Sequence, residues 1–287
     1  MYMNKDTEFL IAGGDLRQIY MEKYLKSLGY RVHSVFLTPS DGNTKENLKK
    51  LIRKSEYIIL PLPVSRDRQS INTSMSEKEL TFSAFTDCVE NGDIIFAGMI
   101  DDKFRTALEM KGAGVHDYFE REDLAFANAV PTAEGVVSVI KDNVPFTIHS
   151  SRAAVTGYGK CGESVANLLK AMNCSVTVSV RSPAQCAKAK ADGHRVCFLK
   201  DLNKHADKFD IIINTVPAPV IGRDVLNRVR RDALIIEVAS APFGVDFESA
   251  REMDIKVIKA SSLPGKTAPA TAGKIIADAI IQMIKEG

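Results

Sequence analysis

The chain has 287 residues, and its 45% hydrophobic content is enough for two domains of ordinary size, each with its own core. The 38 basic and 36 acidic residues leave a net charge of +2, which excludes the strongly basic surface of a nucleic-acid-binding or membrane-surface protein and favours small-molecule partners. The sequence has no apolar run near the ~18 residues of a membrane helix, no signal-peptide core and no Cys or His spacing typical of a metal site, so we expect a soluble, cytoplasmic protein with reduced thiols and no metal.

The first half of the chain reads as strands that alternate with helices. An apolar run stops at Gly13 and Gly14, and an amphipathic stretch from Asp15 to Leu28 ends at Gly29. A second helical pattern runs from Thr44 to Lys54. Strand-like runs lie at 9–12, 31–37, 57–64, 93–100 and around 115–119. These repeats predict a parallel sheet covered by helices.

The stretch from Arg66 to Lys78 is polar and rich in Ser, Asn and Arg. We therefore expect an exposed loop here rather than a buried element. Because it follows a predicted strand, and loops after the strands of open parallel sheets commonly bind ligands, it is a candidate binding loop.

A helix is expected to connect the two halves of the chain. Pro131 and Thr132 stand ahead of an apolar helical pattern, with Glu134 in its first turn. The segment from Thr267 to Glu286 predicts one long apolar helix, which needs a partner surface and would find one by packing back across the first domain. Between these helices a fresh alternation begins at Arg152, with apolar runs at 153–156, 175–180, 195–199, 210–217, 233–240 and 256–260.

The second alternation opens with the pattern G-x-G-x-x-G, directly after a predicted strand and directly before a predicted helix. In this context the first glycine permits a tight turn, the second allows the backbone to approach a pyrophosphate, and the third allows the helix to pack closely on the strand. The alternative is a degenerate half-domain that keeps the fold without a cofactor. We predict dinucleotide contacts from Gly157, Tyr158, Gly159, Lys160, Cys161 and Gly162.

The next predicted strand ends in Arg181 and Ser182, where NAD-specific proteins place an acidic residue on the ribose 2′-hydroxyl. A permanently charged guanidinium followed by a hydroxyl suits a 2′-phosphate, so the sequence favours NADP, with a solvated surface arginine as the alternative. Two later strand ends fall where the nicotinamide half would lie, and they add Thr215, Val216, Pro217, Ala239 and Ser240 as candidate cofactor contacts.

The predicted fold class is therefore α/β, with two Rossmann-like, doubly wound parallel-sheet domains, a connecting helix and a C-terminal helix that packs back on the first domain. We expect a catalytic cleft between the two domains. The predicted boundaries are a flavodoxin-like substrate domain at 1–128, an interdomain helix at 129–145, a Rossmann NADP-binding domain at 146–264 and the C-terminal helix at 265–287.

Six short motifs occur together in an order similar to that of one known family. They are GGDLRQ at 13–18, LPLPVS at 60–65, NAVPTAEG at 128–135, GYGKCG at 157–162, NTVP at 214–217 and LPGKTAPATAG at 263–273. In these motifs the chain resembles the A subunit of bacterial dipicolinate synthase over nearly its whole length. The resemblance implies NADP-dependent oxidation of dihydrodipicolinate to dipicolinate (pyridine-2,6-dicarboxylate) in the mother cell during sporulation, and it implies a partner, the flavoprotein-like B subunit. We also expect a homo-oligomer.

Such a substrate needs cations, hydroxyls or backbone N–H groups for its two carboxylates. Arg17 and Gln18 follow the first strand and begin a helix, a position suited to holding a carboxylate, although a helix-surface arginine is the alternative. Ser65 and Arg66, with Arg68, lie in the polar loop and could close over a dianion, or the arginines could simply be solvated.

Three further candidates flank the predicted domain junction. Thr132 opens the connecting helix, with N-capping as its alternative role, and Glu134 is the most obvious carboxylate base, with a capping role as its alternative. Lys266 precedes the C-terminal helix as an anion contact or a solvated loop cation.

Two other readings of the chain remain. A D-2-hydroxyacid dehydrogenase has a similar domain order. Such enzymes resemble one another in having an arginine just after one strand of the cofactor domain and an acid-histidine pair later in the chain. Here Ser240 and Ala241 occupy the place of that arginine, and this chain has no histidine after His205. A non-catalytic NADP-binding regulatory subunit would explain the glycine loop without an acid-base residue. The cationic candidates Arg66 and Lys266 argue against it, because a sensor needs no dicarboxylate site.

Overall fold

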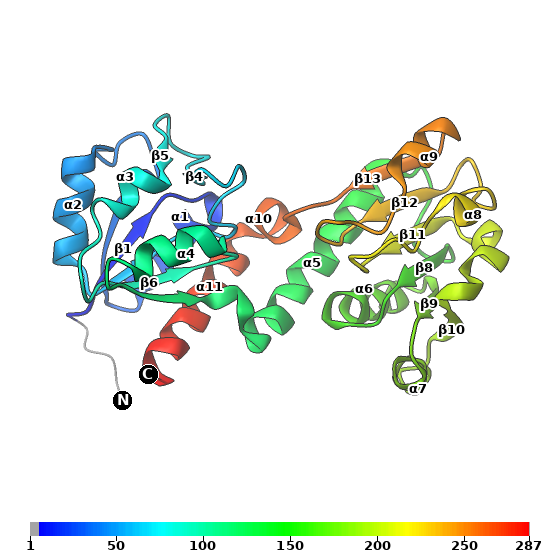
Figure 1. The fold of residues 1–287 in the computed structure, drawn as a ribbon. Helices are drawn as coiled ribbons and strands as arrows, with labels where there is room; N and C mark the ends of the chain where they lie inside the picture. Colours follow the sequence, from blue (N-terminus) through cyan, green and yellow to red (C-terminus); the bar gives the residue numbers. More distant parts are fainter. Residues whose placement is uncertain (1–5, 287) are drawn as a thin grey trace. The chain divides into compact units, whose positions relative to one another are not determined.

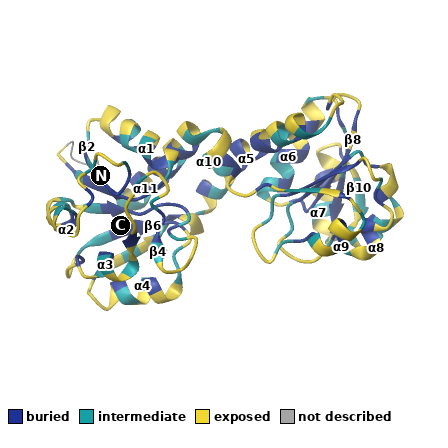
Figure 2. Ribbon diagram, turned by 90° about the horizontal axis from the view of Figure 1, so that it is seen from above, coloured by how far each residue is buried: buried dark blue, intermediate teal, exposed yellow. Residues whose placement is uncertain are grey.

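A computed structural model describes residues 6–286 and divides the chain into two compact units (Figure 1). Unit 1 comprises the residues up to Asn128 together with those from Ala268 onwards, and unit 2 comprises Ala129–Thr267. In both units the buried residues concentrate on the central strands (Figure 2). Each unit therefore has its own core, as the hydrophobic content of the sequence requires.

Unit 1 is a parallel sheet in the order β2-β1-β3-β6-β7, the flavodoxin-like order. Buried apolar side chains such as Leu10 and Ile58 point to one face of the sheet, and Phe9 and Ile59 point to the other, so both faces carry a core. The strands are β1 (Glu8–Ala12), β2 (Arg31–Val35), β3 (Tyr57–Ile59), β6 (Ile94–Ala97) and β7 (Gly114–Asp117), and the helices between them are α1 (Leu16–Ser27), α2 (Lys45–Lys54), α3 (Phe82–Thr86) and α4 (Asp102–Glu109).

The C-terminal helix completes unit 1, which confirms its predicted packing on the first domain. A Cβ atom on Gly273 would collide with the carbonyl oxygen of Arg17, so the glycine allows this helix to lie directly against α1. The expected single helix from Thr267 to Glu286 is α11 (Pro269–Glu286), and a separate short helix, α10 (Leu263–Thr267), precedes it. Proline has no N–H to continue α10 but is well suited to the first position of a helix. For this reason α10 ends before Pro269 and α11 begins at it.

The polar stretch after β3 is not wholly an exposed loop, and that expectation was wrong in part. It contains the strand β4 (Ser70–Ile71), which pairs antiparallel with β5 (Leu80–Thr81) just beyond the stretch, and Ile71 and Asn72 are buried. The backbone of Asn72 donates to the Val64 carbonyl (2.7 Å) and accepts from the Gly14 N–H (2.7 Å). Backbone pairing of this kind cannot be read from a polar composition.

Unit 2 is a parallel sheet in the order β10-β9-β8-β11-β12-β13, the Rossmann order. The strands are β8 (Arg152–Thr156), β9 (Ser175–Val180), β10 (Arg195–Phe198), β11 (Ile211–Asn214), β12 (Leu234–Glu237) and β13 (Lys256–Lys259). The helices are α6 (Lys160–Ala171), α7 (Pro183–Ala191), α8 (Arg223–Leu226) and α9 (Phe247–Glu252), with the 3-10 turns η2 (Leu199–Lys204) and η3 (Ala206–Lys208) after β10. The predicted α/β class with two Rossmann-like domains is confirmed.

The connecting helix begins earlier than expected. Helix α5 (Glu122–Asn143) contains Pro131 in its interior, so Thr132 and Glu134 lie in the middle of the helix and neither caps its start. Leu124 packs in the core of unit 1, and Val136 and Ile140 pack in the core of unit 2. This burial at both ends extends the helix through the proline, whose ring costs one backbone hydrogen bond.

Among residues 6–286, no helix has the length and apolar character needed to span a bilayer.

Candidate functional site

The glycine loop of unit 2 follows β8 in a tight turn. Gly157 has a φ of +85°, and its N–H donates to the Ser179 carbonyl at the end of the neighbouring strand (2.8 Å). A Cβ atom on Gly157 would lie 2.8 Å from Oγ1 of Thr215. The backbone conformation and the contact with Thr215 both require glycine at this position.

The other two glycines have different surroundings. A Cβ atom on Gly162 would collide with the Gly157 carbonyl oxygen, so this glycine lets α6 pack closely on the turn. A Cβ atom on Gly159 would have no neighbour within 4 Å, so the space in front of this residue is open. Gly159 is also the N-cap of α6 and offers no side-chain cap. The first N–H groups of α6 therefore face an open space that fits the pyrophosphate of a dinucleotide.

Arg181 follows β9, next to this turn in the sheet. It is exposed and forms no hydrogen bond or ion pair with another residue in the described part of the chain. Ser182 caps α7 by accepting from the Gln185 N–H (3.3 Å), and its hydroxyl proton can still be donated. The two residues that follow β9 are thus an arginine and a serine, so the position offers a charge for a phosphate rather than a carboxylate acceptor for a hydroxyl.

A buried polar network joins the carboxyl ends of three neighbouring strands. Thr156, Asn214 and Glu237 are the last residues of β8, β11 and β12 and lie opposite one another in the sheet register. The Thr156 hydroxyl donates to Oδ1 of Asn214 (2.5 Å), and Nδ2 of Asn214 donates to Oε1 of Glu237 (2.7 Å). All three side chains are fully or almost fully buried. The network therefore holds the carboxyl ends of β8, β11 and β12 together.

The Glu237 carboxylate also holds the loop that follows β12. It accepts from the backbone N–H groups of Ala239 (3.0 Å), Gly244 (2.8 Å) and Val245 (2.9 Å), and Glu237 itself is only 1% exposed. Asn214 meanwhile donates to the Val216 carbonyl (3.0 Å). The loops after β11 and β12, which carry the predicted nicotinamide contacts, are thus both held by the buried pair Asn214 and Glu237. Glu237 is not among the residues predicted from the sequence, although an acid that ends the apolar run ALIIE was a usable signal.

The other predicted cofactor residues differ in what their side chains can do. Tyr158 is 3% exposed and donates its hydroxyl to Asp192 (2.7 Å), so only its backbone can face a ligand. Burial and this hydrogen bond raise the pKa of Tyr158, and burial raises the pKa of the Cys161 thiol, which keeps both side chains neutral. The remaining candidates are exposed or half-buried around the strand ends, namely Lys160, Thr215, Val216, Pro217, Ala239 and Ser240.

In unit 1, Arg17 and Gln18 are occupied by structural contacts. Arg17 is 4% exposed, and its guanidinium binds the Asp15 carboxylate (2.7 and 2.9 Å) and the Leu62 carbonyl oxygen. Gln18 is fully buried and completes the capping box of α1 by accepting from the Asp15 N–H (3.0 Å). These contacts tie the start of α1 to the loop after β3 and occupy the Arg17 guanidinium, whereas Nε2 of Gln18 is buried with no hydrogen-bond partner among the described residues.

Asp67 organises the polar turn that follows. Its carboxylate accepts from the Ser65 hydroxyl (2.9 Å), the Gln69 N–H (2.8 Å) and both the N–H (2.9 Å) and the hydroxyl (2.6 Å) of Ser70. The Ser70 hydroxyl, with the backbone N–H groups of Ser70 and Gln69, holds the pKa of Asp67 well below its ordinary value. The Ser65 hydroxyl also accepts from the Arg68 N–H (2.9 Å), so it is committed to the turn.

The same turn presents two arginines, Arg66 and Arg68, to a cavity of about 560 Å³. Neither guanidinium forms a hydrogen bond or ion pair with the residues described, and Arg68 has a φ of +64°, an unusual conformation for a side chain of this size. The cavity also carries two carboxylates, Asp102 and Asp101, the second of which caps α4 by accepting from the Lys103 N–H (3.0 Å). Arg66 is a predicted site residue, whereas the organising role of Asp67 was not predicted.

The candidates near the predicted domain junction lie in unit 2. A Cβ atom on Gly135 would lie 2.8 Å from Cβ of Leu263, so α10 packs directly on α5. Glu134 and Lys266, on these two adjacent helices, are exposed or half-buried, whereas Thr132 is buried. The Glu134 carboxylate and the Lys266 ammonium group thus lie on neighbouring helices, whereas the Thr132 side chain is buried.

Comparison with known proteins matches the two parts of the chain to two different families. Residues 8–119 match the family of the N-terminal domain of the dipicolinate synthase A subunit, and residues 128–277 match the family "S-adenosyl-L-homocysteine hydrolase, NAD binding domain". The chain is 29% identical to the dipicolinate synthase A subunit of Bacillus subtilis, over 96% of this chain and 95% of that protein. Crystal structures of the A subunits from Bacillus halodurans and Bacillus subtilis superpose with TM-scores of 0.87 and 0.86, at 27% and 28% identity, and cover 97% and 99% of this chain and 97% of each of theirs.

The fold, the glycine loop and the matched domain define a dehydrogenase-type protein whose cofactor is a nicotinamide dinucleotide. The two bacterial A-subunit structures cover both domains of this chain. The chain is similar to dipicolinate synthase A subunits over almost its whole length, a resemblance that its sequence motifs predicted.

Proposed function

We propose that the chain oxidises dihydrodipicolinate to dipicolinate with NADP during sporulation, together with a flavoprotein-like B subunit. In this reaction the dihydropyridine loses one hydride and one proton, NADP becomes NADPH, and the ring becomes aromatic. The similarity to a dipicolinate synthase A subunit over 96% of the chain supports the substrate. The name of the relative, which is one part of a multi-subunit synthase, supports a second component.

The cofactor half of the proposal depends on one observation. The open space at Gly159, in front of the uncapped start of α6, fits a pyrophosphate, and the unpaired Arg181 beside it fits a 2′-phosphate. When bound, the dinucleotide supplies the acceptor for the hydride. Glu237 and Asn214 position the backbone of Val216 and Ala239 at the strand ends where the nicotinamide half would lie.

The substrate half of the proposal assigns the two carboxylates to the Asp67-organised turn. Arg66 and Arg68 are held on a rigid turn with no internal acceptor among the described residues, so they are prepared to bind a dianion without first breaking an ion pair. Arg17 and Gln18 support this turn indirectly, because Arg17 fixes the loop at Leu62.

For the proton, we propose Glu134 as the acceptor and Lys266 as an additional contact for the substrate carboxylates. Both lie on helices that pack together in unit 2, and neither is buried. The gain of aromaticity favours proton loss, so a strong base is unnecessary and Glu134 needs only to lie within hydrogen-bond reach. Thr132 is buried and has no part in this step.

The substrate assignment predicts that the double variant Arg66→Gln/Arg68→Gln binds dipicolinate at least about 100-fold more weakly, because each lost charge-assisted hydrogen bond costs about tenfold or more. Isothermal titration calorimetry with dipicolinate on the NADP-saturated protein measures this. Arg53→Gln is the matched control, since Arg53 is an exposed arginine of unit 1 paired with Glu90 on the surface. Equal affinity for dipicolinate in the double variant and the control would remove the turn from the substrate site.

A further inference from the structure

Unit 2 contains a second cavity, of about 310 Å³, that the proposed reaction does not use. It lies at the amino ends of three strands, where Arg152 begins β8, Ser175 begins β9 and Arg195 begins β10, and η3 closes it with Lys208. The glycine loop follows the opposite, carboxyl end of β8. The cavity is therefore separate from the cofactor site.

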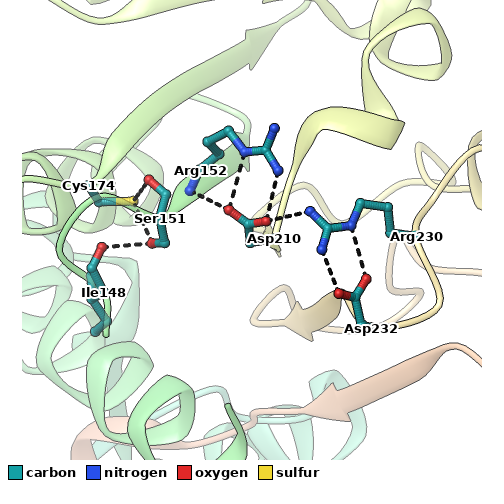
Figure 3. A network of polar contacts seen from close by, with 7 residues as sticks. All are labelled: Ile148, Ser151, Arg152, Cys174, Asp210, Arg230 and Asp232. Atoms are coloured by element: carbon teal, nitrogen blue, oxygen red, sulfur yellow. Dashed lines mark hydrogen bonds and ion pairs between the residues drawn. The ribbon is translucent and has the colours of Figure 1, made fainter. Parts of the chain in front are cut away.

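One of its cations is already neutralised. Arg152 binds the Asp210 carboxylate through its guanidinium (3.0 Å) and its backbone N–H (2.8 Å), and Asp210 also binds Arg230 (2.7 Å), which in turn binds Asp232 (Figure 3). This network contains two arginines and two aspartates, so its charges balance. It holds the Arg152 side chain in a fixed position at the edge of the cavity.

Two other cations of the cavity have no acidic partner. Nη1 of Arg195 donates to the Ser175 hydroxyl (3.0 Å), and Nζ of Lys208 lies 3.4 Å from Nδ1 of His205. In the described chain no carboxylate forms an ion pair with either cation, and the nearby Asp201 is engaged by Lys204. The cavity is thus positively charged, and its donors can bind an anion that carries two charges.

The remaining walls limit what kind of anion fits. Phe209, which is 4% exposed, and Val196 give an apolar side, and Thr177 adds a hydroxyl. The volume is near the lower end of the range for small-molecule pockets, about 300 Å³, which is too small for a dinucleotide. A phosphate with a compact organic body matches the charge, the hydroxyl donors and the apolar wall together.

We propose that this cavity binds a small organic phosphate of mononucleotide size, with the phosphate on Arg195 and Lys208 and the organic body against Phe209. The site is independent of the cofactor loop and of dihydrodipicolinate oxidation. Binding at the amino ends of β8, β9 and β10 gives the protein a place to sense a phosphorylated metabolite.

The test uses the full chain saturated with NADP, so that the glycine loop is already filled. Calorimetric titration with AMP is expected to show one binding event, and Arg195→Gln/Lys208→Gln is expected to weaken it at least about 100-fold, because two charged donors are lost. The matched control Arg228→Gln/Lys190→Gln removes two exposed cations of the same unit that lie outside the cavity. Unchanged thermal unfolding and NADP affinity in both variants show that folding is intact.

A parallel titration with inorganic phosphate separates the organic phosphate from the anion alone. Tighter binding of AMP than of phosphate, lost only in the Arg195 and Lys208 variant, supports the proposal. Equal affinity for the two probes would overturn the assignment of an organic ligand. Absence of AMP binding, or the same loss in the control, would overturn the site. Each of these readouts is a binding measurement, so they stand whether or not dihydrodipicolinate is oxidised.

Discussion

Arg181→Asp is expected to weaken NADP binding by about 1000-fold while leaving NAD binding within a few-fold of the original, because a bidentate charge-assisted contact is lost and a carboxylate then repels the 2′-phosphate. Arg181 is exposed and has no partner within the described chain, so its replacement should leave the fold of unit 2 unchanged. The measurement is the ratio of the Kd values for NADP and NAD, taken by fluorescence titration.

The control for this change is Arg228→Asp, which makes the same charge reversal at an exposed position outside the strand end of β9. It should leave the ratio of the two Kd values unaltered. If Arg181→Asp also left the ratio unaltered, Arg181 would be a solvated surface arginine and the preference for NADP would have to be abandoned.

Glu237→Ala is expected to lower the free energy of unfolding of the protein by about 3–5 kcal/mol, because several buried donors lose their acceptor at once. These donors are the Asn214 amide and the N–H groups of Ala239, Gly244 and Val245. Glu237→Gln should cost less, since the amide keeps one acceptor oxygen of the right shape. Urea unfolding followed by circular dichroism gives the free energies.

A surface glutamate of the same unit provides the comparison for Glu237. Glu248→Ala changes a residue in the first turn of α9 that is not buried and should move the free energy of unfolding by less than about 1 kcal/mol. If Glu237→Ala and Glu248→Ala had the same free energy of unfolding, the buried contacts of Glu237 would contribute nothing to holding the loops after β11 and β12.

Much of the fold was predictable because its signals are local. Apolar runs that alternate with helical patterns indicated both sheets, and the glycine loop was recognised from the strand before it and the helix after it. Arg181 could be placed from spacing alone, since β9 follows α6 directly and its end must lie beside the first strand.

The errors and omissions involve contacts that depend on strand order or burial. Glu237 meets Asn214 because β11 and β12 are neighbours, and no pattern within either segment records this. Helix α5 runs through Pro131 because burial at both of its ends outweighs the loss of one hydrogen bond. Arg17 looked like a free cation at a strand end, and only the structure places it on the Leu62 carbonyl.

The proposed oxidation can be observed by giving the purified chain NADP and freshly generated dihydrodipicolinate, with and without the B subunit, and following the near-ultraviolet absorbance of reduced nicotinamide. We expect NADPH and dipicolinate to form in equal amounts, and Arg181→Asp to slow this formation at limiting NADP. Tight NADP binding with no NADPH formed, even in the presence of the B subunit, would contradict the dehydrogenase assignment.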